Sequence, residues 1–180
     1  MNALAPVLQK GGRILTRAEY IDIVEKNADM VYRIAFSYFG SKADAEDVMQ
    51  EVFLKLHNCD KIPETDDARK AWLIRVTTNQ CHSMFRSPFR KRRVWLTDYE
   101  WDSFADEGSL DEEIARRHAV YTAVMSLPAK YRITIHLYYY EDLSVTQIAS
   151  LLRVKETTVQ TRLARAREKL KVILKEDMLF

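Results

Sequence analysis

The segment from 156 to 171, ETTVQTRLARAREKLK, constrains the fold more than any other part of the chain. Read as a helix, it places Val159, Leu163, Ala166 and Leu170 at spacings of four, three and four residues, which is a single apolar stripe. Five Lys or Arg side chains and only two Glu surround that stripe. The sequence therefore predicts a helix with one buried face and one strongly cationic face.

A shorter helix precedes this cationic helix, and only residues 153–155 separate the two. Residues 144–152 have helical periodicity and open with the capping box Ser144-Val-Thr-Gln147. Two helices joined by such a tight turn are typical of the helix-turn-helix, whose second helix enters the major groove of DNA. A solvated basic face is the alternative explanation of the charge, but it leaves the capped partner helix unexplained.

The cationic helix carries both kinds of side chain that a DNA-reading helix needs. Residues 153–175 hold eight Lys or Arg and two Glu, a net charge of +6 compared with +2 for the whole chain. Short polar groups near the start of the helix can reach base edges, and they are Thr157, Thr158, Gln160 and Thr161. Cations beside them can reach phosphates, and they are Lys155, Arg162 and Arg165.

The whole chain is predicted to be all-α. It has 180 residues with only four Gly and four Pro, which suits helices joined by short connections. Residues 1–18 are predicted to be an N-terminal tail, and a first helix is expected from Glu19 until Gly40 ends it. The other predicted helices cover residues 42–56, 67–85, 114–127, 130–140, 144–152 and 157–174.

An abrupt change of charge marks the predicted domain boundary. Residues 86–93, RSPFRKRR, contain five bases and no acid, whereas residues 94–113 contain eight acids and no base. The acidic segment lacks a clear period, so it is predicted to be a linker between two small helical domains, 19–93 and 114–177. Its aromatic residues are expected to dock on one of these domains: Trp95, Tyr99, Trp101 and Phe104.

The second predicted helix is acidic rather than basic. Opposite its apolar stripe lie Glu46, Asp47, Gln50 and Glu51, and residues 19–60 carry a net charge of −5. The helix dipole accounts for acids in the first turn, but it does not account for Gln50 and Glu51, which lie one turn further on. This exposed acidic strip predicts a protein partner.

The third predicted helix has another character, because aromatic and amide groups in AWLIRVTTNQCHSMFR run directly into the basic RSPFRKRR. That combination suits nucleic acid that is single-stranded or partly opened, where bases can stack or enter pockets.

Three motifs together resemble a known family: DAEDVMQEVFLKL, WLIRVTTNQCHSMFR and LSVTQIASLLRVKETTVQTRLARAREKL. The chain resembles the extracytoplasmic-function sigma factors, small members of the sigma-70 family of bacterial transcription initiation factors. The family has two helical domains, region 2 and region 4, joined by a linker without a region 3. The resemblance implies that the chain directs promoter recognition, −10 melting and transcription initiation by RNA polymerase.

The resemblance also implies partners and contact residues. Core RNA polymerase would bind through its β′ clamp helices and its β flap, and the positions matching the clamp contact are Asp47, Gln50 and Glu51. The positions matching −10 recognition include Asn79 as the best candidate for a base contact; the full set is Trp72, Asn79, Arg86, Arg90, Lys91, Arg92 and Arg93. The −35 element would be read by Arg153, Lys155, Thr157, Thr158, Gln160, Thr161, Arg162 and Arg165. An anti-sigma factor is a further expected partner.

Two positions depart from the family pattern. Arg153 stands where the family often has glycine, and Lys155 where it often has a serine N-cap. Either Arg153 adopts a left-handed conformation or the turn geometry differs. Both residues are candidates for additional phosphate contacts.

The acidic linker suggests a hypothesis about the free protein. Eight acids between two basic segments should repel duplex DNA until the linker lies along the polymerase.

Alternative functions leave more of the sequence unexplained. A free-standing helix-turn-helix regulator accounts for 114–175 but not for the acidic helix or Asn79. An enzyme is not expected, because the glycines are scattered and form no phosphate-binding loop. A metal or redox site could use His57, Cys59, Cys81 and His82, but their spacing matches no common zinc motif.

No cofactor, small-molecule substrate or membrane insertion is therefore predicted. The absence of a long apolar run and of a disulfide framework favours a cytoplasmic protein.

Overall fold

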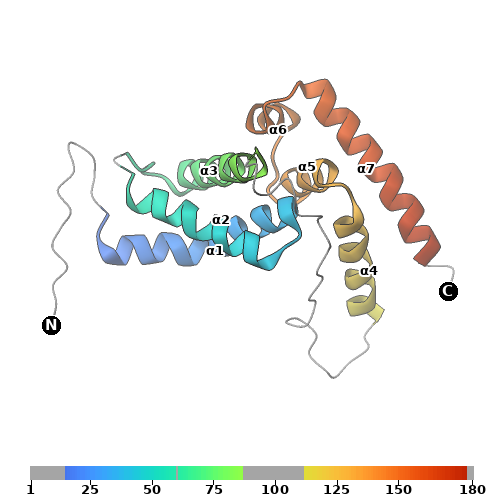
Figure 1. Cartoon of the computed structure of the whole chain (residues 1–180), viewed down its shortest axis with the longest axis horizontal. Helices are drawn as coiled ribbons and strands as arrows, with labels where there is room; N and C mark the ends of the chain where they lie inside the picture. Colours follow the sequence, from blue (N-terminus) through green and yellow to red (C-terminus); the bar gives the residue numbers. More distant parts are fainter. Residues whose placement is uncertain (1–14, 60, 87–111, 178–180) are drawn as a thin grey trace.

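The computed structural model describes residues 15–59, 61–86 and 112–177, and every regular element within these ranges is an α-helix (Figure 1). The all-α prediction is therefore confirmed. The helices are α1 (Arg17–Phe39), α2 (Lys42–His57), α3 (Asp66–Arg86), α4 (Glu112–Ser126), α5 (Ala129–Tyr139), α6 (Val145–Leu152) and α7 (Glu156–Asp177).

The helix ends show why some predicted boundaries were wrong by a few residues. α1 begins at Arg17 because Thr16 caps it: the Glu19 amide donates to the Thr16 hydroxyl at 3.2 Å, and the Thr16 amide donates to the Glu19 carboxylate at 2.9 Å. This capping box was not predicted, although Thr16 and Glu19 have the same spacing as Ser144 and Gln147. α4 begins at Glu112, inside the predicted linker, whose earlier residues lie outside the described ranges.

The C-terminal end of α1 follows the prediction. Gly40 adopts the left-handed conformation, with φ 66° and ψ 15°, and its amide donates to the Phe36 carbonyl at 2.8 Å. Glycine takes this conformation without the steric cost that a side chain would bring. α2 can therefore fold back directly on α1 after Ser41, which caps its first turn.

The N-terminal helices α1, α2 and α3 pack pairwise around a common apolar core. The side chains that are wholly inaccessible there include Val31, Ile34, Val52, Leu56 and Leu73. The expected stripe of α2 is confirmed, because its apolar positions are buried or half-buried.

The C-terminal helices are organised around α7, which contacts α4, α5 and α6. The stripe that opened the sequence analysis is confirmed: Val159, Leu163 and Ala166 are buried, and Leu170 is half-buried against the core. The cationic side chains of α7 are exposed, except for that of Arg162, which is half-buried.

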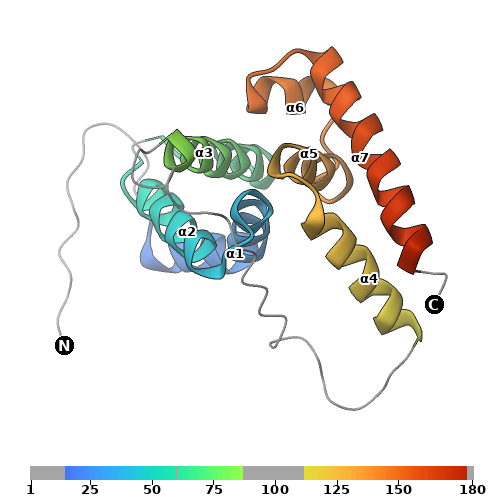
Figure 2. The same ribbon diagram turned by 45° about the vertical axis from the view of Figure 1, so that its right-hand side comes forward.

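The two groups of helices also pack against each other, which no sequence pattern predicted. α5 contacts both α1 and α7 and lies between them in both views (Figures 1 and 2), and α6 contacts α3. Buried apolar residues from both groups belong to one contiguous core. Within the described residues, no helix is long and apolar enough to span a membrane.

Candidate functional site

The α6–α7 pair has the local geometry that its sequence predicted. The Gln147 amide donates to the Ser144 hydroxyl at 3.2 Å, and the Ser144 amide donates to Gln147 Oε1 at 2.8 Å, so the capping box is confirmed. Arg153 has φ 55° and ψ 47°, which resolves the two alternatives for the turn in favour of a left-handed arginine. The Val154 amide closes the turn on the Ala149 carbonyl at 3.0 Å.

The start of α7 presents polar side chains to solvent. Gln160, Thr157 and Thr161 are exposed, and Thr158 and Arg162 are half-buried. The Thr161 hydroxyl donates to the Thr157 carbonyl at 2.7 Å, so its hydrogen is used within the helix while its lone pairs face outward. This arrangement leaves Gln160 as the amide best placed to reach a base edge.

A groove runs along the first two turns of α7, against the start of α5. It has a volume of about 320 Å³, and its lining adds Lys130 and Tyr131 to the predicted contacts Thr157, Thr158, Thr161, Arg162 and Arg165. Three cations and four hydroxyl groups around one concave surface are suited to the phosphates of a DNA strand. Lys130 was not among the predicted contacts, because only the tertiary structure brings the start of α5 beside α7.

Arg165 has a partner in this groove. The Arg165 guanidinium lies near the Tyr131 hydroxyl, and its interaction with that hydroxyl is the main reason that the Tyr131 pKa lies below its usual value. Nearby Lys130 and Lys169 act in the same direction. Arg165 and Tyr131 thus line the groove together, with Arg165 exposed to solvent.

The residues predicted to act at the −10 element are only partly described. Trp72 is half-buried and packs against the core, and Asn79 is half-buried on α3. Asn79 Oδ1 accepts a hydrogen bond from Arg153 Nη2 at 3.3 Å, so candidates for two different DNA contacts meet across the molecule. Arg86 is the last residue of α3, and the remaining four positions, Arg90, Lys91, Arg92 and Arg93, lie outside the described residues.

The acidic face of α2 is exposed as expected. Asp47, Gln50 and Glu51 are exposed, and Leu54, one turn further along the same face, is 53% exposed. An exposed apolar side chain gives a protein partner area to bury beside the polar contacts. The signal was present in the sequence, because Leu54 falls off the apolar stripe of its helix.

The histidines and cysteines considered for a metal site have other contacts. His82 Nε2 lies 3.3 Å from the Tyr38 hydroxyl, and the His57 ring meets Tyr20 edge-on. Cys81 is wholly buried, which raises the pKa of its thiol and leaves the thiolate disfavoured. In the described part of the chain, no three His, Cys, Asp or Glu side chains are grouped as a metal ion requires.

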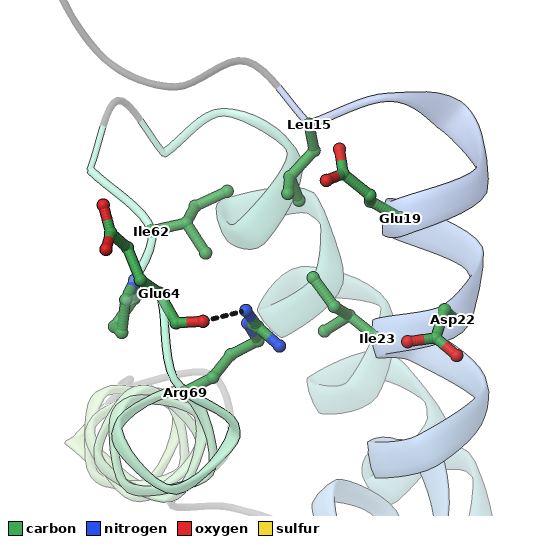
Figure 3. Close-up of a pocket in the computed structure, with 8 residues that line it drawn as sticks. Leu15, Glu19, Asp22, Ile23, Ile62, Glu64 and Arg69 are labelled. Atoms are coloured by element: carbon green, nitrogen blue, oxygen red, sulfur yellow. Dashed lines mark hydrogen bonds between the residues drawn. The ribbon is translucent and has the colours of Figure 1, made fainter.

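A small cavity of about 80 Å³ lies at the far end of the N-terminal helices, between the start of α1 and the loop before α3 (Figure 3). Arg69 reaches into it and donates from Nη2 to the Glu64 carbonyl at 2.9 Å. Glu19 and Asp22 border the same cavity. It is far smaller than a typical ligand pocket, and Arg69 is already engaged with its neighbours.

Two protein-family models match the chain. Residues 23–93 match Sigma-70 region 2, and residues 117–170 match Sigma-70, region 4. The ECF RNA polymerase sigma factor SigL of Mycobacterium tuberculosis is 32% identical over 166 residues, which cover 90% of each chain. The ECF RNA polymerase sigma factor SigW of Bacillus subtilis is 29% identical over 172 residues, covering 87% of this chain and 89% of SigW.

A solved structure has the same fold. The sigma factor RpoE of Bartonella quintana, determined in complex with the anti-sigma factor NepR, superposes with a TM-score of 0.63 at 24% identity. The match covers 87% of this chain and 96% of that one, so it includes both groups of helices.

Proposed function

This chain belongs to the extracytoplasmic-function sigma factors of the sigma-70 family, and we propose on that premise how its surfaces divide the work of transcription initiation. It is a sigma factor that binds core RNA polymerase and promoter DNA and directs promoter recognition. A free-standing regulator is not favoured, because both sigma regions are present. We assign region 2 to residues 19–93, the linker to 94–113 and region 4 to 114–177.

α7 reads the −35 element in this proposal, and the observation that carries it is the groove along its first turns. Gln160 and Thr161 face outward at the start of the helix, where the major groove would lie. Phosphates would be held by the cations on the groove and beside the turn, namely Lys130, Arg153, Lys155, Arg162 and Arg165. Thr157 and Thr158 would complete the polar surface.

α2 binds the polymerase in this proposal. Asp47, Gln50 and Glu51 form the polar part of the contact with the β′ clamp helices, and Leu54 supplies apolar area beside them. Acids arranged around an apolar residue combine electrostatic steering with burial. The groove-bearing C-terminal helices would contact the β flap.

In this proposal, α3 and the basic residues after it bind the −10 element. Asn79 carries the amide that can read a base, and the basic positions Arg86, Arg90, Lys91, Arg92 and Arg93 can follow the backbone of a melted strand. Trp72 supports this surface from the core side, where it is half-buried.

The chain itself performs no covalent chemistry in this proposal, since RNA synthesis belongs to the polymerase, and it works in the cytoplasm where the polymerase is. The similar RpoE structure was determined with an anti-sigma factor, and we include an inhibitor of that kind among the proposed partners.

Transcription in vitro from a promoter library tests the assignment. Core polymerase with the wild-type chain should select a −35 and a −10 sequence, and Gln160→Ala should relax selection at −35 only. Asn79→Ala should relax selection at −10 only. If either variant relaxes selection at the other element, the division between α3 and α7 is wrong.

A further inference from the structure

Gln80 of α3 has a side-chain partner on the neighbouring helix α2. Lys55 Nζ donates a hydrogen bond to Gln80 Oε1. Lys55 is exposed and Gln80 is half-buried, so the pair lies at the surface where the two helices meet. A lysine in the last turn of a helix suits the helix dipole, but the dipole does not account for a hydrogen bond to the next helix. What this bond decides is the orientation of the Gln80 amide.

The chemistry of the two side chains leaves one orientation. An ammonium group has three hydrogens to donate and no lone pair with which to accept, whereas an amide has a carbonyl oxygen and an NH2 group. Only the amide oxygen can therefore accept from Lys55. The NH2 group of Gln80 is turned the other way and presents its donors there. A glutamine without such a neighbour can rotate its amide and offer either group.

Gln80 lies on the surface of α3 that is assigned above to the −10 element. The opposite side of α3 is buried in the core and consists of Leu73, Ile74, Thr77, Thr78 and Cys81. Gln80 follows Trp72 by eight residues, which is about two turns along one row of the helix, and it is next to Asn79. It therefore shares the outer side of α3 with both described residues that are proposed to act at −10.

An amide with a fixed orientation distinguishes bases by their exocyclic groups. Thymine and guanine carry a carbonyl oxygen, O4 or O6, where cytosine and adenine carry an amino group. An outward NH2 group can donate to the carbonyl, but it meets the amino group donor to donor. Glutamine commonly reads adenine by accepting from N6 while donating to N7, and that pairing needs the amide oxygen, which here faces Lys55.

We propose that Lys55 fixes Gln80 as a hydrogen-bond donor at one position of the melted −10 element, where the chain consequently prefers thymine or guanine to adenine or cytosine. Gln80 contacts the base, and Lys55 is a positioning residue that acts through Gln80. The proposal rests on the assignment of α3 to the −10 element. Its effect is that of a single hydrogen bond, which corresponds to a preference of about two- to tenfold.

Selection from a promoter library tests the proposal. Core polymerase with the full chain transcribes barcoded templates whose −10 element is randomised, and sequencing of the barcodes gives the base preference at each position. The wild-type chain should favour thymine or guanine about two- to tenfold at one position. Gln80→Ala should lose that preference and keep those at the other positions.

Lys55→Glu is the sharpest variant, because a carboxylate accepts hydrogen bonds and cannot donate them. It should turn the Gln80 amide round, so that the oxygen faces the base and the preference at the same position changes to adenine or cytosine. Lys55→Met leaves the amide free to rotate and should weaken the preference without reversing it. Lys42→Glu makes the same change of charge at an exposed position in the first turn of α2 and should keep the wild-type preference.

Three results would overturn the proposal: unchanged −10 preferences in Gln80→Ala, a wild-type preference for adenine or cytosine at the position that Gln80→Ala affects, or identical preferences in Lys55→Glu and Lys42→Glu. These preferences are ratios between promoters in one reaction. A loss of polymerase affinity in Lys55→Glu, which lies beside the acidic face of α2, would therefore not change them.

Asn79→Ala separates this proposal from the assignment of α3. If Asn79→Ala relaxes −10 selection while Gln80→Ala does not, the Gln80 contact is wrong and the assignment of α3 stands. If neither variant relaxes −10 selection, the assignment of α3 to the −10 element fails together with the proposal.

Discussion

Gln160 and Arg165 occupy the same helix but different surroundings. Gln160 is exposed near the start of α7 and does not line the groove, whereas Arg165 lines the groove beside Tyr131. Phosphate contacts raise affinity for every sequence, and base contacts discriminate between sequences. The two residues can therefore be separated by what their loss does to specificity.

Arg165→Ala should weaken holoenzyme binding about evenly across −35 variants and flatten the log–log salt dependence by about 0.9 for the lost contact. Gln160→Ala should cost about 1–3 kcal/mol on the preferred −35 sequence and much less on mismatched ones. Binding of a −35 panel at several salt concentrations measures both effects.

Lys130→Ala provides a control from the opposite wall of the groove and should behave as Arg165→Ala does. A changed sequence ranking for Arg165→Ala, with an unchanged ranking for Gln160→Ala, would reverse the two assignments.

At the scale of single elements, α2 provides the clearest separation of folding from binding. Apart from Asp44, its buried residues are apolar, and its candidate contacts are all exposed. Replacing Asp47, Gln50 and Glu51 by Ala should weaken core polymerase binding roughly 10- to 100-fold, as expected when a central cluster of contacts is removed. Circular dichroism should show an unchanged helix content.

A matched control removes the same charge elsewhere. Glu25→Ala with Asp67→Ala takes two exposed acids from α1 and α3 and should leave polymerase affinity near the wild-type value. Equal losses in the two variants would mean that net charge, rather than the α2 face, attracts the polymerase.

The turn between α6 and α7 contains conformational strain that a substitution can relieve. A side chain in the left-handed region costs about 1–2 kcal/mol relative to glycine, and Arg153 is in that region. Arg153→Gly should therefore raise the free energy of unfolding by about 0.5–1 kcal/mol, since glycine also loses more chain entropy on folding. Urea unfolding of the full chain measures the change.

Ser150→Gly in α6 is the comparison, because glycine there meets ordinary helical geometry. It should lower the free energy of unfolding by up to about 1 kcal/mol. A destabilised Arg153→Gly chain would show that the Asn79 contact outweighs the backbone strain.

At the scale of the whole molecule, Glu141 links stability to pH. Burial opposes ionisation of Glu141, but the nearby His136 and Lys70 outweigh it, so the pKa of this carboxyl lies below its usual 4.5. His136 Nε2 is 3.4 Å from one carboxylate oxygen, and Lys70 Nζ is 3.3 Å from the other. A carboxyl group whose pKa is lower in the folded state than in the unfolded state stabilises the fold at pH values above the unfolded-state pKa. This stabilisation is lost as the pH falls.

Glu141→Gln should therefore lower the free energy of unfolding by about 1 kcal/mol near pH 7, where the wild-type carboxylate is charged. The difference between the two chains should shrink as pH falls below 4.5 and through the lower folded-state pKa of the wild type. Denaturant unfolding at several pH values measures it. If the difference in free energy of unfolding between the two chains stayed constant across this pH range, the charge of Glu141 would not be its cause.

The sequence by itself determined the helices, their caps and the exposed residues of α2 and α7. These features depend on interactions within a few residues, such as the Ser144–Gln147 capping box and the apolar stripe of α7. The three motifs indicated the family because each of them lies within one helix or two neighbouring helices, where the sequence is local.

Only the tertiary structure decided how the two groups of helices meet. Arg132 binds carbonyls that lie 94 and 95 positions away in sequence, and Lys130 lies on a groove with residues of α7. Backbone carbonyls are the same in every residue, so no side-chain pattern records which ones an arginine will reach. Contacts made through the backbone and between distant helices depend on packing geometry, and periodicity along the chain contains no information about them.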